Sequence, residues 1–293
     1  MWTVPSTQGP FQQGTPSPQR KLGFFERVGI GWKLTKVSLG VLRKDKGLML
    51  LPFLSFLIIA VSWIVFIASI FLTVFPTGTL NVALFVVGIF FLYFFTYFVT
   101  AFFAAAVMGA AMIRLNGGVG SAGEGLRVAA RNVGRILGWA ILSATVGVIL
   151  RAIAERFGIV GRIIAGGASI AWGILTYLVI PALIFERLGP WAAVKRSGGL
   201  IKQTWGEAAG GYFTMGAIFA LLGLLGLLIF LAGVAIGTLT AIVVFGIIAL
   251  IYILILALFA SAAQSILVTA LYRYATTGKV AEGWPTSLMP SRY

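Results

Sequence analysis

Two stretches without a charged side chain are too long for the core of a soluble protein. Residues 48–113 and residues 208–272 contain no Lys, Arg, Asp or Glu. About 20 apolar residues are enough for a helix to cross a bilayer, so each stretch can cross at least twice. The whole chain is 60% hydrophobic and 10% charged, against about 25% charged in soluble domains. We therefore expect an all-α integral membrane protein.

Turn signals divide the apolar sequence into six predicted spans. The sequence Phe-Pro-Thr-Gly at residues 75–78 interrupts the first block, and Gly and Thr cluster between residues 233 and 240 in the second. The spans are expected at residues 48–75, 80–113, 136–153, 163–185, 211–231 and 241–272. A seventh span stays open, because one more turn in the last block would divide it again.

The second predicted span is longer than the membrane is thick. Residues 80–113 would form a helix of about 50 Å at 1.5 Å per residue, whereas the hydrocarbon core is about 30 Å thick. Either this helix tilts steeply or one of its ends emerges from the bilayer. The last predicted span, residues 241–272, has the same property.

The basic residues predict the orientation. The chain has 22 Lys and Arg against 7 Asp and Glu, a net charge of +15. All of these cations except Arg151, Arg156 and Arg162 fall in the tails or in connections on one side of the predicted spans. The positive-inside rule then predicts a multi-pass protein of the cell membrane with both termini in the cytoplasm, and gives no reason to expect nucleic-acid binding.

Three similar units follow one another along the chain, between a disordered cytoplasmic tail at residues 1–20 and a cytoplasmic tail at residues 279–293. We expect pseudo-repeats at residues 21–117, 118–189 and 190–278. Each has a basic amphipathic segment followed by a helical hairpin, and each ends near an arginine, namely Arg114, Arg187 and Arg273. Parallel repeats of this kind are one way in which membrane folds are built.

The amphipathic segments supply the candidate binding residues. Arg127, Arg131 and Arg135 recur every four residues, which would place them on one helix face. Residues 191–205 carry an apolar stripe with a tryptophan at each end. Trp opposed to Lys and Arg is typical of a helix lying in the membrane interface. The candidates for binding lipid or a partner are Lys33, Lys36, Arg127, Arg131, Arg135, Trp191, Lys195, Arg196, Lys202 and Trp205.

Anionic membrane lipids are the partners that this pattern favours. A protein partner or a second copy of the chain stays open as another occupant of the same residues. The simpler interpretation is that these cations are topology anchors, because the positive-inside rule alone requires basic loops.

Polar side chains are few inside the predicted spans. One face of the last span carries Ser261, Gln264, Ser265, Thr269 and Arg273. Such residues join helices by hydrogen bonds or line a cavity. Arg151 and Glu155 are four residues apart and are expected to pair with each other, and Pro181 is expected to kink the fourth span.

Residues 181–197 (PALIFERLGPWAAVKRS) carry a family resemblance. A proline in a span, an acidic exit, a glycine and a basic Ala-rich helix resemble the repeat unit of polytopic membrane families of unknown function. The segment is also similar to the membrane region attached to some bacterial glycerophosphodiester phosphodiesterases. The resemblance implies six spans but no catalytic residues, because the phosphodiesterase domain is a separate soluble barrel that uses His and acidic ligands.

Catalytic chemistry has little support in the sequence. The chain has no Cys and no His, and its acidic residues are scattered, whereas acid–base or metal catalysis needs such groups close together. We therefore expect no cofactor, no metal and no enzymatic activity. A non-enzymatic protein that organises or binds lipids or partner proteins through its basic helices is favoured. A transporter or channel for a lipid-like or anionic solute is the alternative.

Overall fold

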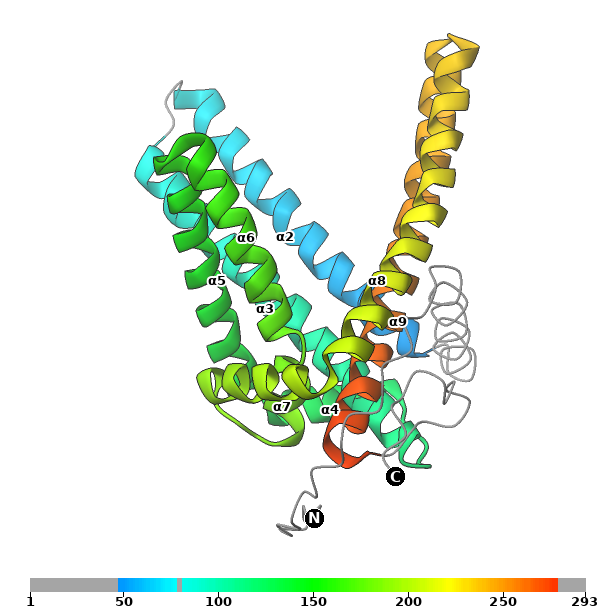
Figure 1. Cartoon of the computed structure of the whole chain (residues 1–293). Helices are drawn as coiled ribbons and strands as arrows, with labels where there is room; N and C mark the ends of the chain where they lie inside the picture. The colour runs from blue at the N-terminus through cyan, green and yellow to red at the C-terminus, as the bar shows by residue number, and fades with distance from the viewer. Residues whose placement is uncertain (1–46, 78–80, 279–293) are drawn as a thin grey trace.

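The protein is all-helical over the residues that its structure covers. The computed structural model describes residues 47–77 and 81–278, and the side chains of residues 75–77 and 203–214 are outside this description. Every regular element in these ranges is a helix (Figure 1). The helices are α2 (Gly47–Thr77), α3 (Val82–Leu115), α4 (Ala122–Arg131), α5 (Val133–Arg156), α6 (Gly158–Thr176), α7 (Val179–Phe185), α8 (Pro190–Ile236) and α9 (Leu239–Thr277).

Six of these segments are long and apolar enough to cross a membrane, as predicted. The two longest blocks each contain two, so the last block is not divided a second time within the described residues. The second break is a two-residue turn: Gly237 has φ of +75°, a left-handed conformation that glycine adopts without strain. Thr238 then caps α9 by accepting a hydrogen bond from the amide of Ala241 at 3.2 Å.

Pro181 does more than kink the fourth span. The helix ends at Thr176 and starts again at Val179, because Pro181 has no N–H to donate to the preceding turn. The amide of Leu178 donates instead to the hydroxyl of Ser197 on α8, at 3.0 Å. Both residues are fully buried, so the break is closed by a side chain from the next hairpin.

The buried core lies at one end of the molecule, which we call the basal end. Here the C-terminal parts of α3 and α9 meet α4, α7 and the first turns of α8 (Figure 1). The opposite, distal end holds the α5–α6 and α8–α9 connections. Fully buried core residues include Leu48, Ala106, Ala110, Ala129, Leu183, Leu200 and Leu267.

Helix α9 is longer than the hydrocarbon core of a bilayer is thick. From Leu239 at the distal end, about 20 residues of α9 are enough to cover the hydrocarbon thickness. They end shortly before Ala262, from which most residues of α9 are buried. Nearer the distal end, large side chains such as Leu72, Ile163 and Leu239 are exposed, as expected for a surface that lipid covers. The long helices are therefore longer than a bilayer requires, and their buried ends pack together at the basal end.

Glycine lets α4 lie directly on α3. A side-chain carbon at Gly125 would be 2.2 Å from the carbonyl oxygen of Ala106, so only glycine fits at this contact. The helix begins with a capping box between Ser121 and Glu124, in which each side chain accepts a hydrogen bond from the other residue's amide. The turn before it is fixed by Arg114, whose Nε donates to the carbonyl of Gly120 at 2.6 Å.

Candidate functional site

Basic residues occur on α4, on the first turns of α8 and on the segments that join the helices beside them. These elements meet at the basal end (Figure 1). Six of these basic residues are exposed and two are half-buried. We call this set the basal cations: Arg127, Arg131, Arg135, Arg187, Lys195, Arg196, Lys202 and Arg273.

The two described carboxylates at this end each have a partner, and only one of these partners is a basal cation. Glu124 accepts from the amide of Ser121 at 3.0 Å in the capping box. Glu186 accepts from Arg196 Nε, at 2.9 Å to one carboxylate oxygen and 3.0 Å to the other. Among the described residues, no carboxylate pairs with Arg127 or Arg131. Over the described residues, cations therefore outnumber carboxylates on the basal surface.

Arg127, Arg131 and Arg135 do not lie on one continuous helix, contrary to the prediction from their spacing. Helix α4 ends at Arg131 and α5 begins at Val133. Asn132 forms the junction, and its side-chain oxygen accepts a hydrogen bond from Arg135 Nη1 at 2.9 Å. Arg127 and Arg131 are exposed, whereas Arg135 is half-buried and held at the junction.

The apolar stripe of α8 faces the protein rather than lipid, which corrects the interpretation of that stripe as a membrane-facing surface. Val194 and Ile201 are in the hydrophobic core. Trp191 is the exception, with 58% of its surface exposed. The side chain of Trp205 is outside the described set, and so are the candidates Lys33 and Lys36.

Arg196 belongs to a three-residue network that the sequence did not reveal. Besides its contacts with Arg196, Glu186 accepts a hydrogen bond from Tyr272 Oη at 2.7 Å. Tyr272 is buried, with 3% of its surface exposed. The network connects the end of α7, the first turns of α8 and the end of α9. Arg196 is therefore held by a partner in the protein, whereas no described carboxylate pairs with Lys195 beside it.

Two hydroxyls of the predicted polar face of α9 form hydrogen bonds with backbone carbonyls of the same helix. The hydroxyl of Ser265 donates to the carbonyl of Ser261 at 3.0 Å, and that of Thr269 donates to the carbonyl of Ser265 at 2.7 Å. Ser265 and Thr269 are buried and Arg273 is half-buried. Gln264 is exposed and lines a small hollow of about 110 Å³ between α8 and α9.

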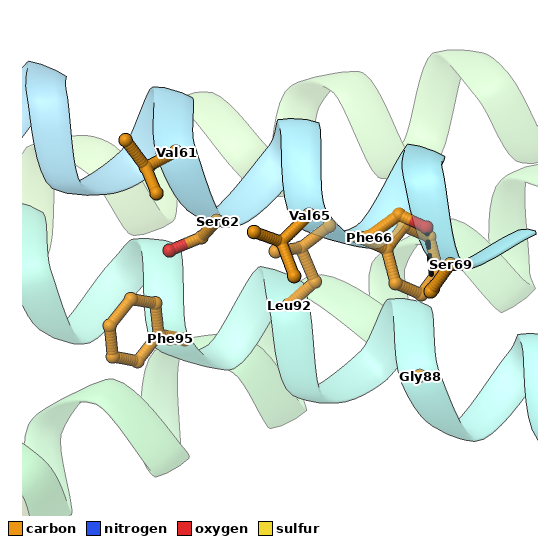
Figure 2. Close-up of a pocket in the computed structure, with 8 residues that line it drawn as sticks. All are labelled: Val61, Ser62, Val65, Phe66, Ser69, Gly88, Leu92 and Phe95. Carbon is orange, nitrogen blue, oxygen red and sulfur yellow. Dashed lines mark hydrogen bonds between the residues drawn. The ribbon is translucent and has the colours of Figure 1, made fainter.

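A larger hollow of about 440 Å³ lies between α2 and α3 and is wide open to the surroundings (Figure 2). Its lining is apolar apart from Ser62 and Ser69. Their hydroxyls donate to carbonyls of α2 itself, at Ile58 and Phe66, at 2.7 Å each. With no charged or unsatisfied polar group among its lining residues, this hollow offers apolar contact and no chemistry.

Charged groups elsewhere are sparse. Arg151 and Glu155 form the predicted pair near the distal end, with 2.8 Å between Arg151 Nε and Glu155 Oε1, and both are exposed. The described residues contain no group of three or more His, Cys, Asp or Glu that could hold a metal ion.

Comparison with known proteins gives one family. The model of a family described as "Family of unknown function (DUF6159)" matches residues 82–282, which is more than half of the chain. The chain belongs to this family. The DUF6159 match begins at the start of α3 and includes α4, α8 and α9, so it contains all the basal cations. No curated protein and no solved structure matches the chain.

Proposed function

We propose that this DUF6159 protein is a non-enzymatic membrane protein that binds anionic lipid headgroups through its basal cations. The observation that carries the proposal is the exposure of Arg127 and Arg131, with which no described carboxylate pairs, at the same end as Lys195 and Lys202. Of the described carboxylates at this end, Glu124 is held in its capping box and Glu186 pairs with Arg196, so neither neutralises Arg127 or Arg131.

Electrostatics sets the expected size of the effect. Each Lys or Arg near an anionic leaflet contributes about 1 kcal/mol of attraction. The attraction is screened over a Debye length of about 10 Å at 0.1 M salt. Two arginines on α4 therefore contribute a measurable and salt-dependent share of lipid binding.

The test compares charge removal at the two ends of the molecule. The double variant Arg127→Gln, Arg131→Gln removes two basal charges, and the matched control Arg156→Gln, Arg162→Gln removes two distal charges. Each protein is purified in mild detergent with phosphatidylglycerol, and the retained lipid is measured by mass spectrometry at low and high salt. We expect the basal variant to lose about 2 kcal/mol of binding at low salt and less at high salt. Equal retention in both variants would refute the proposal.

A protein partner or a second copy is the other occupant of the same surface. Mass spectrometry of the proteins that co-purify in the same detergent tests this directly. A stoichiometric protein that is lost from the Arg127→Gln, Arg131→Gln variant, with lipid retention unchanged, would replace lipid as the partner.

Transport of an anionic or lipid-like solute is the second candidate. The interrupted helix at α6–α7 favours it, because transporters often bind solutes at broken helices. Against it, the amide of Leu178 at the break is already bonded to Ser197, and the break is in the basal core rather than at mid-membrane. Solute flux into proteoliposomes, compared with empty liposomes, would decide in favour of transport.

A further inference from the structure

One glycine lies where the first turns of α8 approach the end of α6. A side-chain carbon at Gly198 would be 3.3 Å from Leu175 Cδ2. Leu175, in the last turn of α6, has 43% of its surface exposed and belongs to a segment that is long and apolar enough to cross a membrane. The Gly198 side of α8 therefore faces an exposed part of this apolar segment.

Three residues share that side of α8. With 3.6 residues per turn, positions three and four apart are neighbours and positions seven apart nearly coincide around the axis. Lys195 is three residues before Gly198 and Lys202 is four after it, while Trp191 is seven before it. All three side chains are exposed. We call Trp191, Lys195 and Lys202 the α8 flank.

Arg196 is on the opposite side of the helix. It precedes Gly198 by two residues, which is about 200° around the axis. Its guanidinium binds Glu186, which in turn binds Tyr272. Arg196, which points away from α6, therefore forms an ion pair within the protein, whereas Lys195 and Lys202 stay exposed.

The composition of the α8 flank fits a lipid surface. An exposed indole is favoured at the level of the headgroups, and lysines attract anionic headgroups. The exposed side chains of Ile174 and Leu175 continue the flank with an apolar surface on α6. Charge and position together complement an anionic phospholipid leaflet.

We infer that the α8 flank docks on an anionic phospholipid leaflet, with Trp191 in the headgroups and Lys195 and Lys202 on phosphates, while Arg196 stays in its internal network. The inference rests on the proposed function and assigns it to one side of one helix. It also separates Lys195 from Arg196, although the two are adjacent in sequence.

Single cysteines test the orientation, since the chain has no native cysteine. Nitroxide labels are placed at Trp191→Cys and Lys202→Cys on the flank, and at Ala192→Cys, an exposed position about 100° around the helix from Trp191, toward Arg196. In vesicles of phosphatidylcholine and phosphatidylglycerol, collisions with oxygen report lipid and collisions with a nickel chelate report water. We expect oxygen to dominate at 191 and 202 and nickel at 192. Dominance of nickel at all three positions would overturn the inference, and Lys202→Cys keeps the test valid if loss of Trp191 impairs folding.

Charge removal tests the lipid class. We expect Lys195→Gln, Lys202→Gln to lower phosphatidylglycerol retention about tenfold or more at low salt, and Arg196→Gln to leave retention near that of the unmodified protein. Equal loss in the two variants, or no loss in the lysine variant, would overturn the inference. The α4 variant Arg127→Gln, Arg131→Gln keeps the α8 flank intact. A failure of that variant to change retention would count against the wider proposal without touching this one.

Discussion

Tyr272 Oη donates a 2.7 Å hydrogen bond to Glu186 Oε1 across 86 residues of sequence. The tyrosine ring also packs against Phe185, with 5.8 Å between ring centroids. Arg196 binds the same carboxylate from α8. The last turns of α9 are thus connected to the α7–α8 connection by a charged acceptor, within the packed basal end.

Removing the Tyr272 hydroxyl should lower the stability of the protein more than removing another tyrosine hydroxyl of α9. Hydrogen bonds to charged groups contribute about 1.5–3 kcal/mol and neutral ones about 0.5–1.5 kcal/mol. Tyr272→Phe loses a bond to a carboxylate. The control Tyr252→Phe loses a bond to the carbonyl of Leu222, 2.9 Å long in the structure. We expect a larger drop in apparent melting temperature for Tyr272→Phe in the same detergent; equal drops would show that Glu186 adds no charge effect.

The interrupted helix predicts a second stability effect. Ser197→Ala removes the hydroxyl that accepts a hydrogen bond from the buried amide of Leu178, and an unsatisfied buried donor costs about 1–3 kcal/mol. Ser169→Ala is the control, because the Ser169 hydroxyl donates to the carbonyl of Ala165 within its own helix. Thermal unfolding should be lowered by the first change and nearly unaffected by the second. A neutral Ser197→Ala would mean that the amide finds another acceptor.

The spans could be predicted from sequence because the bilayer imposes length and composition on each helix separately. The third span was expected at residues 136–153 and the helix is Val133–Arg156, so the error is about one turn at each end. The break between α8 and α9 falls inside the predicted Gly/Thr cluster. Local pattern was sufficient for these features.

Long-range packing could not be predicted in the same way. The periodicity of α8 identifies an apolar side, but it does not say whether protein or lipid covers that side, and Val194 and Ile201 turn out to be in the core. The contact between Glu186 and Tyr272 depends on how α7 packs against α9, and the pattern of a single sequence does not predict that packing. The threefold pseudo-repeat stays a prediction, and Lys33 and Lys36 lie outside the described residues.

The purified protein should turn over no phosphodiester, ester or peptide substrate. Hydrolysis needs a nucleophile or base near an electrophilic stabiliser, and the chain has neither His nor Cys. Glu155 and Glu186 are near opposite ends of the molecule and cannot act as a pair. Assays with chromogenic esters, phosphodiesters and peptides test the prediction. Activity that persists through purification and disappears on changing one Glu or Lys would contradict it.

The charge distribution predicts that the basal end faces the cytoplasm. Phe157→Cys places a thiol at the exposed α5–α6 connection, and Gly199→Cys places one on the exposed side of α8 at the basal end. A membrane-impermeant maleimide should label Phe157→Cys in intact cells and label Gly199→Cys only after the cells are opened. The reverse result would invert the orientation without changing the six spans.

The contact between α4 and α3 gives a matched pair of substitutions in one helix. Gly125→Ala would place a carbon 2.2 Å from the carbonyl oxygen of Ala106, which must push α4 away from α3, at a cost of about 1–3 kcal/mol for such overpacking. At Gly123 the nearest atom to an added carbon is Ser121 Oγ, at 4.0 Å. Gly123→Ala should therefore be neutral, or stabilise by up to about 1 kcal/mol through higher helix propensity. We expect the melting temperature of Gly125→Ala to be clearly lower than that of Gly123→Ala. Lipid retention through Arg127 and Arg131 should fall only in Gly125→Ala, because only there is α4 displaced.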